Sequence, residues 1–467
     1  MDFYNRPRNG GPGGYSPGGP SRFKFKIPEK GRIRFVLIVV LTIAIVKFAG
    51  PCVFKKPPVD DTAKPVNAVQ EKGKKAPDFI MTVDDVRHLV RENEISVNAA
   101  EQRAVVNTEV ITRGRSWWGE RDRDAGEDSL TLWLSVDTSL QKYAASMFRQ
   151  YRPRYAAAAA IDPATGRVLA LASYAAPGEP VDGSDLYLRG IFPAASVFKT
   201  VVAAAGIERG GMHANTAIQH YGRRHTLYKS QLKKDLKTSD DITLQDAFAY
   251  SVNPAFARIA LFNVNKDIVT DYGRRFGFND SIPFEFAADV SEMFSPDSDF
   301  SVAEFASGFN RKTSISPLFG ALLAGAVCEG GVIREPTVVD SVWSSVRGAC
   351  VYRRGTRIWR RAVKESTASE LRGLMTKVTQ YGTARKTFRP LRESRKYNMY
   401  EFGGKTGSVN KLGLGRVDWF VGFARHPNDR NKRIAVGVVT THGDYWTVHS
   451  SYIAAELFKK YISNQSL

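Results

Sequence analysis

One apolar run constrains this chain more than any other feature. The segment FVLIVVLTIAIVKFAGPCVF, residues 35–54, has Lys47 as its only charged residue. About 20 such residues are what a helix needs to cross a hydrocarbon core of roughly 30 Å. A cleaved signal peptide is the alternative, but the run is long for one and the segment before it is longer than the usual n-region. We therefore predict a single transmembrane helix over residues 35–54.

The residues before this run indicate how the chain is oriented. Residues 1–34 are rich in glycine and proline and end in a basic run, a composition that buries too little apolar surface to fold. Because basic segments stay on the cytoplasmic side of a membrane span, we predict a disordered basic cytoplasmic tail over residues 1–34. Everything after Phe54 is then expected outside the cytoplasm, on a chain that crosses the cell (inner) membrane once.

The net charge of +20 does not by itself choose a partner, because a basic balance fits nucleic acid, anionic lipid or a carboxylate-rich substrate. Besides the tail, basic clusters occur at residues 222–237, 353–361 and 385–396. They lie in the part predicted to be exported, so nucleic acid is not an expected partner. We interpret them as solvated faces, with anionic wall polymer or lipid headgroups as the alternative. The lipid bilayer is an expected partner of the span itself.

Beyond the span, composition divides the chain into two parts. Residues 55–127 begin as a Pro/Lys-rich linker and contain one helix-like stretch, residues 82–96, with apolar residues on one face. We predict a linker and a small juxtamembrane element there. From residue 128 to 467, strand-like and helical patterns follow one another closely, including two apolar runs joined by a turn over residues 154–174. We predict one folded domain over residues 128–467, with this hairpin at its centre.

Ser196 and Lys199, in PAASVFKT (residues 193–200), form the first candidate catalytic pair. Pro193 stands where a helix is expected to begin, and the first turn of a helix presents unpaired N–H groups that can hold an oxyanion. A spacing of three places the hydroxyl and the amine on one helix face. The lysine can serve as a base only if burial or positive neighbours lower its pKa. Because this spacing occurs three more times in the chain, the pair needs support from other motifs.

Two further motifs follow. YSVNPAF, residues 250–256, interrupts two helical stretches, and Asn253 in it is either a functional amide or only a helix N-cap. GGKTGSVN, residues 403–410, opens a meander of three strand-like runs that precedes a closing helix. Within it, Lys405 and Thr406 offer a positive charge and a hydroxyl to a carboxylate, and glycine permits the close approach of a ligand backbone.

The order of the three motifs carries the strongest inference. Ser-Val-Asn begins 55 residues after Ser196, and Lys-Thr-Gly begins 154 residues after Ser251. In this order they resemble the active-site motifs of penicillin-binding proteins and serine β-lactamases. The stretches DPATGRVLALAS, SISPLFGALLAGAVCEGGVIREP, MTKVTQYGTA and WFVGF are similar to the transpeptidase domain of high-molecular-mass, monofunctional (class B-like) penicillin-binding proteins. The resemblance covers residues 130–462.

The resemblance implies catalytic roles for four side chains. Ser196 would attack the carbonyl of a D-Ala-D-Ala stem peptide, and Lys199 would accept its proton. Ser251 would relay a proton to the leaving D-alanine, and Asn253 would orient Lys199 and the substrate amide. An amine from a neighbouring stem peptide would then take the acyl group and form a crosslink, which makes the expected activity that of a serine-type D,D-transpeptidase.

The same resemblance implies a substrate-binding strand at residues 405–408. Lys405 would supply positive potential, and Thr406 would bind the terminal carboxylate. Gly407 completes the Lys-Thr-Gly motif, and the backbone N–H of Ser408 would form an oxyanion hole with that of Ser196. Peptidoglycan stem peptides are the expected substrates, and β-lactams the expected inhibitors.

The predicted fold class is α+β. Strands before the serine and after Lys-Thr-Gly, with a helical block between them and a helix at the end, indicate one antiparallel sheet covered by helices. That the first two strands join the last three in a five-stranded sheet is implied by the resemblance. Two departures from the family pattern concern subfamily and partner docking more than chemistry. The Arg-Gly-x-Ile-x-Asp-Arg stretch of the pedestal, typical of monofunctional members, is not recognisable in residues 55–127, and Ser316-Pro317 stands where Thr-Pro is usual.

Several alternatives remain at this point. A D,D-carboxypeptidase differs only in using water to resolve the acyl-enzyme, and a non-catalytic β-lactam or peptidoglycan receptor would use the same fold. A β-lactamase is disfavoured, because the chain has no Glu-x-x-Leu-Asn stretch. With no glycosyltransferase motif upstream, a membrane glycan polymerase is an expected partner. No cofactor or metal is expected, since the histidines lack ligand spacing, and Cys328 and Cys350 are as consistent with a disulfide as with two thiols.

Overall fold

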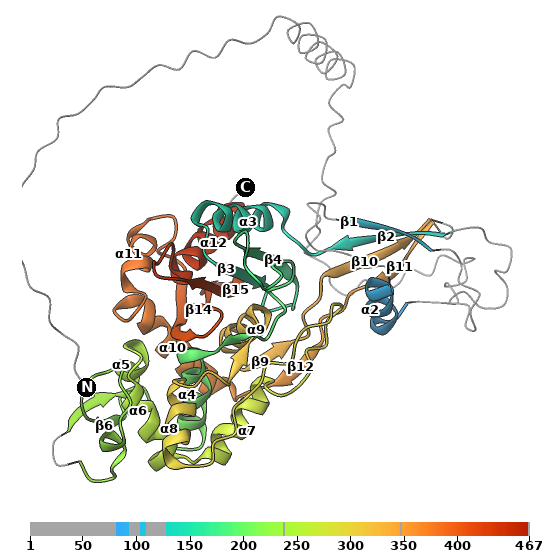
Figure 1. Ribbon diagram of the computed structural model, residues 1–467. Helices are drawn as coiled ribbons and strands as arrows, with labels where there is room; N and C mark the ends of the chain where they lie inside the picture. The colour runs from blue at the N-terminus through green and yellow to red at the C-terminus, as the bar shows by residue number, and fades with distance from the viewer. Residues whose placement is uncertain (1–80, 93–102, 109–127, 237–238, 346–347, 466–467) are drawn as a thin grey trace, which may run out of the picture. The chain divides into compact units, whose positions relative to one another are not determined.

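The computed structural model (Figure 1) describes residues 81–92, 103–108, 128–236, 239–345 and 348–465. The predicted cytoplasmic tail (1–34) and transmembrane helix (35–54) lie outside these ranges. Within these ranges, we find no helix with the length and apolar character needed to cross a bilayer.

A five-stranded antiparallel sheet forms the centre of the fold, as expected (Figure 1). The hairpin predicted over residues 154–174 supplies two neighbouring strands, and the meander that begins with Lys-Thr-Gly supplies the other three. In spatial order the strands are β13 (Glu401–Lys411), β14 (Gly415–His426), β15 (Asp429–His442), β3 (Tyr155–Ile161) and β4 (Val168–Ala175).

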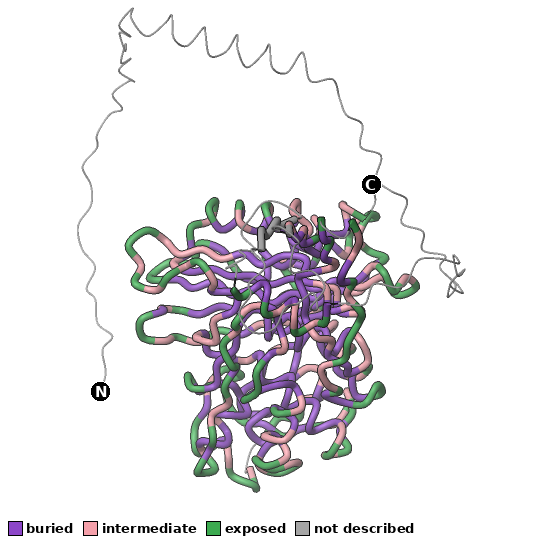
Figure 2. The backbone as a smooth tube through the Cα atoms, turned by 90° about the vertical axis from the view of Figure 1, so that its right-hand side faces the viewer, coloured by how far each residue is buried: buried purple, intermediate pink, exposed green. Residues whose placement is uncertain are grey.

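Helices cover both faces of this sheet, which explains why its inner strand β3 is buried along its whole length. All seven residues of β3 are buried, and Figure 2 shows the strands as mostly buried tubes. On β15, a Cβ at Gly437 would overlap the carbonyl oxygen of Pro317 in α9 (Pro317–Cys328). Thr440, three residues further on, bonds the hydroxyl of Ser450 in α12 (Ser450–Asn464) at 3.0 Å. Because alternate residues of a strand point to opposite faces, α9 and α12 cover different faces.

Short-range capping fixes where two of these helices begin. Asp137 caps α3 (Thr138–Tyr151), since its carboxylate accepts bonds from the N–H groups of Ser139 and Leu140. Ser316 caps α9 by accepting a bond from Phe319 N at 3.1 Å. The serine at this position therefore supplies the hydroxyl that a threonine would supply, because both residues are good N-caps.

A helical region with three short strand pairs adjoins the sheet (Figure 1). Its helices are α4 (Lys199–Glu208), α5 (Leu244–Ala249), α6 (Asn253–Arg258), α7 (Lys266–Phe276), α8 (Asp299–Ser307), α10 (Glu365–Gln380) and α11 (Arg385–Glu393). The short pairs are β5 (Phe192–Pro193) with β8 (Ser314–Ile315), β6 (Ala217–His220) with β7 (Asp240–Thr243), and β9 (Val332–Arg334) with β12 (Ile358–Arg361).

A second, four-stranded sheet lies apart from the central one (Figure 1). One of its strands, β2, opens the domain predicted over residues 128–467, and another comes from the stretch interpreted as linker and juxtamembrane element. In order the strands are β1 (Arg103–Thr108), β2 (Asp128–Leu134), β10 (Val339–Ser344) and β11 (Ala349–Arg353).

The helix expected within residues 82–96 is α2 (Val83–Glu92), and it is anchored by two arginines. Arg87 pairs with Glu335 at 3.1 Å, and Arg91 donates to the carbonyl oxygens of Phe284 and Glu285. Long-range contacts of this kind tie the segment before residue 128 to the remainder of the described chain.

The two cysteines in the described chain do not pair. Cys328 is buried at the end of α9, and Cys350 is partly buried on β11. Burial raises the pKa of the Cys328 thiol to about 12, so at neutral pH it is an unreactive thiol of the core.

Candidate active site

Ser196 lies in a 3₁₀ turn, Ala195–Phe198, that leads into α4. Pro193 belongs to the short strand β5 and does not open the helix as the sequence suggested. Its carbonyl oxygen accepts a bond from the indole of Trp419 at 2.8 Å, which holds the turn against the central sheet. Ala195 has a positive φ of 48°, a strained conformation for a residue with a side chain. The strain presents the Ser196 hydroxyl to Lys199, at 2.7 Å from its Nζ.

Lys199 is completely buried, and its amine has three neighbours. Nζ lies 2.7 Å from the Ser196 hydroxyl, 2.7 Å from Oδ1 of Asn253 and 2.6 Å from the carbonyl oxygen of Ser307. The last two atoms can only accept hydrogen bonds. A neutral amine therefore gives its two N–H bonds to Asn253 and Ser307, and its lone pair is left to receive the proton of Ser196.

The electrostatic surroundings favour this neutral amine. Burial lowers the pKa of Lys199 well below its ordinary value of 10.5, and the positive charge of Lys405 lowers it further. Among the described residues, no carboxylate raises the pKa of Lys199 against these two effects. Lys199 thus meets the condition stated from the sequence, that burial or a positive neighbour lowers its pKa.

Ser251 and Asn253 lie in the turn between α5 and α6. Asn253 is the first residue of α6, and Val252 occupies the cap position, so the interpretation of Asn253 as an N-cap is wrong. Its amide instead accepts from Lys199 through Oδ1 and donates through Nδ2 to the carbonyl oxygen of His225 at 3.1 Å. Ser251 has a positive φ of 58°, which turns its hydroxyl toward Lys405, whose Nζ donates to it at 2.9 Å.

The third motif lies on β13, beside the serine turn. Lys405 is completely buried, and burial lowers its pKa to about 7. Its Nζ also donates to the carbonyl oxygen of Thr406 at 3.0 Å. The Thr406 hydroxyl lies 2.6 Å from that of Thr383, and Gly407 packs against the backbone of the turn, with a Cβ there 3.3 Å from Ser196 N.

The free edge of β13 faces the serine. β13 is the outermost strand of its sheet, and Arg311, from outside that sheet, donates to the carbonyl oxygen of Asn410 at 2.8 Å. The backbone groups of Asn410 therefore point away from β14. In an antiparallel strand every second residue has its N–H and C=O on the same edge, so those of Ser408 and Thr406 also point outward. The exposed Ser408 can direct its N–H into the space beside Ser196.

The structure thus brings all eight sequence-predicted residues to one place, and it adds three that sequence reasoning missed. The carbonyl oxygen of Ser307 is a backbone group, which no side-chain motif indicates. Gly308 has a φ of 67°, and a Cβ there would overlap the carbonyl oxygen of Ala195. Thr383 lies in the stretch MTKVTQYGTA that supported the family resemblance, but its contact with Thr406 could not be read from the sequence.

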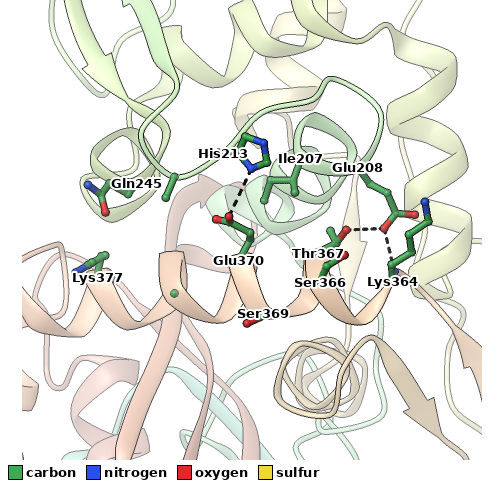
Figure 3. Close-up of a pocket in the computed structure, with 12 residues that line it drawn as sticks. Ile207, Glu208, His213, Gln245, Lys364, Ser366, Thr367, Ser369, Glu370 and Lys377 are labelled. Carbon is green, nitrogen blue, oxygen red and sulfur yellow. Dashed lines mark hydrogen bonds and ion pairs between the residues drawn. The ribbon is translucent and has the colours of Figure 1, made fainter.

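A separate cavity of about 620 Å³ lies between the end of α4 and α10 (Figure 3). Several of its polar groups are paired with each other. Glu208 accepts bonds from Lys364 N at 2.9 Å and from the Thr367 hydroxyl at 2.7 Å, and His213 faces Glu370 at 3.5 Å. Since Ser196 lies before the other end of α4, this cavity is no part of the candidate site.

A buried amine that faces a serine hydroxyl, in a helix-covered five-stranded sheet, defines the class of penicillin-binding serine acyl transferases. The family model described as penicillin binding protein transpeptidase domain matches residues 156–463. The chain belongs to this family, and its membership is consistent with a role in peptidoglycan synthesis.

Individual relatives are distant. Stage V sporulation protein D of Bacillus subtilis (strain 168) is 21% identical over 319 residues, 65% of this chain and 48% of that protein. The chain spans about half the length of the curated relatives it matches.

Two solved structures share the fold. The D,D-transpeptidase domain of a peptidoglycan glycosyltransferase from Eggerthella lenta is 22% identical, with a TM-score of 0.58 over 72% of this chain and 83% of that one. The imipenem acyl-enzyme complex of penicillin-binding protein A from Mycobacterium tuberculosis is 18% identical, with a TM-score of 0.57 over 70% of this chain and 79% of that one. At these identities the likeness concerns the fold.

Proposed function

We propose that this chain is a membrane-anchored peptidoglycan D,D-transpeptidase that forms an acyl-enzyme at Ser196 and is inhibited by β-lactams. One observation carries the proposal. The amine of Lys199 is buried, has a pKa far below its ordinary value, and lies 2.7 Å from the Ser196 hydroxyl with its two N–H bonds directed elsewhere. This arrangement has the parts that nucleophilic acyl transfer needs.

Acylation begins when Ser196 Oγ attacks the carbonyl carbon of the penultimate D-alanine and its proton passes to Lys199. The negative charge that develops on the carbonyl oxygen is held by the N–H groups of Ser196 and Ser408. Loss of one such donor typically costs about 3 to 4 kcal/mol of transition-state stabilisation. Asn253 keeps the Lys199 amine in place throughout this step.

The leaving group then departs with a proton. As the bond between carbonyl carbon and nitrogen breaks, Ser251 passes a proton to the amine of the terminal D-alanine. Lys405, 2.9 Å away, donates to the Ser251 hydroxyl, so it can replenish that proton. Before that proton moves, the positive charge on Lys405 and the hydroxyl of Thr406 hold the terminal carboxylate.

The acyl group is resolved by an amine of a second stem peptide. That amine attacks the ester carbonyl and gives up one proton through Ser251 to Lys405, the bond to Ser196 Oγ breaks, and the proton held by Lys199 returns to Ser196, which leaves a new peptide crosslink. A D,D-carboxypeptidase would use water at this step. We place the chain at the cell membrane through the predicted helix at residues 35–54, with a membrane glycan polymerase as the partner that supplies strands.

Labelling with a fluorescent penicillin tests the proposal. The intact protein is expected to be acylated, with the adduct mapped by mass spectrometry to Ser196, and Ser196→Ala is expected to remain unlabelled. Ser230→Ala is the matched control, because Ser230 has the same spacing to a lysine but is exposed on a surface turn. Absence of an adduct, or an adduct on another residue, would refute the enzyme assignment.

A second assay separates the possible outcomes of deacylation. The membrane-bound protein is incubated with a lipid-linked wall precursor and a glycan polymerase, and the products are digested and analysed for crosslinked dimers. Dimers support the transpeptidase. Release of D-alanine without dimers would indicate a carboxypeptidase, and penicillin binding without any peptide turnover would indicate a receptor.

A further inference from the structure

A long basic loop joins β6 to β7, at the end of the molecule opposite to the second sheet (Figure 1). Connections longer than about 12 to 15 residues are uncommon in compact domains, and those that occur usually carry a function. We call residues 221–236, the described part of this connection, the basic loop. It presents five exposed cations and one carboxylate, that of Asp235. The cations are Arg223, Arg224, Lys229, Lys233 and Lys234.

The protein itself does not neutralise these five cations. Within the described ranges, none of their side chains has an ion pair or a hydrogen bond with a carboxylate. Arg154 and Arg167, by contrast, each pair with a carboxylate at 2.6 Å. Arg224 lies instead over the ring of Tyr250, at 4.3 Å from its centre, which leaves its N–H groups for a ligand. Like charges gathered without partners keep a positive potential over the loop.

Two buried side chains fix the shape of the basic loop. Gln231, on the loop itself, accepts a bond from Tyr228 N at 2.7 Å and donates to the carbonyl oxygen of Tyr221 at 2.6 Å. Arg258 of α6 donates to the carbonyl oxygens of residues 233–234. Both side chains belong to buried residues. Because these bonds hold the backbone, a ligand would not have to order it on binding.

Two tyrosines stand out among the exposed residues of the basic loop. Tyr221 and Tyr228 are 45% and 60% exposed, although a tyrosine ring is largely apolar. A sugar ring offers apolar C–H faces that pack against such rings, and carboxylates on a glycan suit guanidinium and ammonium groups. Nucleic acid also combines flat rings with negative charge, but it is not expected outside the cytoplasm, where we expect this domain. The aromatic rings and unpaired cations together thus fit an acidic glycan.

The basic loop also contacts the candidate site through its backbone. The carbonyl oxygen of Arg224 accepts a bond from Asn253 N at 2.7 Å, and that of His225 accepts one from Asn253 Nδ2 at 3.1 Å. A polymer bound to the loop therefore lies beside the turn that carries Ser251 and Asn253. It would lie next to the candidate site without occupying the strand at residues 405–408.

We propose that the basic loop is a docking surface for the glycan strand of the wall, which it binds through carboxylates carried by that strand. Holding a strand in this way raises the effective concentration of its stem peptides at Ser196. The surface goes beyond the proposed function, and only the choice of wall glycan as its occupant rests on that function.

Binding of peptide-free glycan strands to the full-length protein tests the proposal. An amidase removes the stem peptides and leaves a free carboxylate on each muramic acid, so the strands stay acidic but offer no peptide to Ser196. The reference is the same strands after conversion of these carboxylates to methylamides. The measured quantity is the ratio of the two dissociation constants, obtained by fluorescence anisotropy of end-labelled strands.

The wild-type protein is expected to bind the acidic strands roughly tenfold more tightly than the methylamide strands. This preference should weaken at high ionic strength, because the charges involved are exposed. The loop variant Lys229→Gln/Lys233→Gln/Lys234→Gln removes three of the five charges and should lower the ratio to about threefold or less.

A matched variant separates the loop from the net charge of the protein. Lys142→Gln/Arg149→Gln/Lys266→Gln removes the same charge from exposed positions on α3 and α7, and it should keep the wild-type ratio. Both triple variants should also keep the wild-type unfolding temperature, because all the substituted side chains are exposed.

Equal binding of the two kinds of strand by the wild type, including no binding of either, would overturn the proposal. A ratio that the loop variant leaves unchanged, or that both triple variants lower alike, would overturn it as well. Tighter binding of polyglycerol phosphate or of phosphatidylglycerol vesicles than of the acidic strands would assign the loop to a different occupant and refute the one proposed. Absence of penicillin labelling at Ser196 would instead refute the proposed function, and because the binding assay does not involve Ser196, the two failures are distinguishable.

Discussion

Replacing Lys405 by methionine should make the protein more stable at neutral pH and less active. Burial lowers the pKa of this lysine from 10.5 to about 7, so folding costs free energy whenever the unfolded chain carries the proton. This difference in pKa between the unfolded and the folded state lowers the free energy of unfolding by about 4 kcal/mol at pH 7 and by about 2 kcal/mol at pH 9. The unfolded state binds more protons across that interval, so the stability of the wild type rises with pH.

Methionine has a similar length but no charge, so it removes this cost. It also removes the bonds that Lys405 donates to Ser251 and to the carbonyl oxygen of Thr406, which contribute about 1 kcal/mol each. The expected net effect of Lys405→Met is a gain of roughly 2 kcal/mol in the free energy of unfolding at pH 7, and almost none at pH 9. Acylation by penicillin should fall, because the positive potential for the carboxylate is lost.

Urea unfolding of both proteins at pH 7, 8 and 9, followed by tryptophan fluorescence, measures the difference. Groups whose pKa does not depend on Lys405 cancel in this comparison, whereas the pKa of Lys199 rises when Lys405 is removed, which adds to the stabilisation of the variant at neutral pH. Lys266→Met, which alters an exposed lysine on α7, is the control and should show no such dependence on pH. A difference between wild type and Lys405→Met that is constant from pH 7 to 9, or a variant that is less stable at pH 7, would refute the reasoning.

Three further predictions concern the serine and its base. Gly308→Ala should abolish penicillin acylation and destabilise the fold by more than 2 kcal/mol, because the added Cβ would overlap Ala195. The control is Gly211→Ala in the same urea unfolding assay. Gly211 has a φ of 62° but open space around it, so this variant measures the cost of backbone strain alone. Lys199→Arg should reduce the acylation rate at least a hundredfold, since a guanidinium stays protonated, and a rate within tenfold of wild type would contradict the assignment of the base. In the wild type, the rate of penicillin acylation should stay constant as the pH is lowered until Lys199 gains its proton, which we expect well below pH 10.5. A fall in this rate centred near the ordinary lysine pKa would contradict a buried neutral amine.

The central sheet could be predicted because its signals are local or repeated. The turn DPATG joins two apolar runs that pair as β3 and β4, and the strands after Lys-Thr-Gly are long and apolar. The sheet to which β2 belongs could not be predicted in the same way. Its pattern reads as a strand, but its partners, β1 and β10, lie on either side of it in sequence at very different distances. Pairing at such separations leaves no periodic trace in the chain.

The candidate site was predictable as a set of residues, through the order of three motifs, but its chemistry was not. Whether Lys199 is a base depends on burial and on Asn253, which comes from a different helix. The sequence left Asn253 as either a cap or a functional amide, because asparagine before a proline suits both. In the structure the side chain of Asn253 faces Lys199, and its Oδ1 accepts a bond from the amine.

The Ser307-Gly308 pair links the base to the nucleophile in a way that no motif reveals. The left-handed conformation of Gly308 ends α8 and leaves the carbonyl oxygen of Ser307 directed at the Lys199 amine. The same glycine packs against the peptide bond between Ala195 and Ser196. Ser307 thus accepts a hydrogen bond from the Lys199 amine, and Gly308 supports the strained turn that presents Ser196. A side chain at position 308 would disturb both at once, so its effect on acylation should exceed what its effect on stability alone explains.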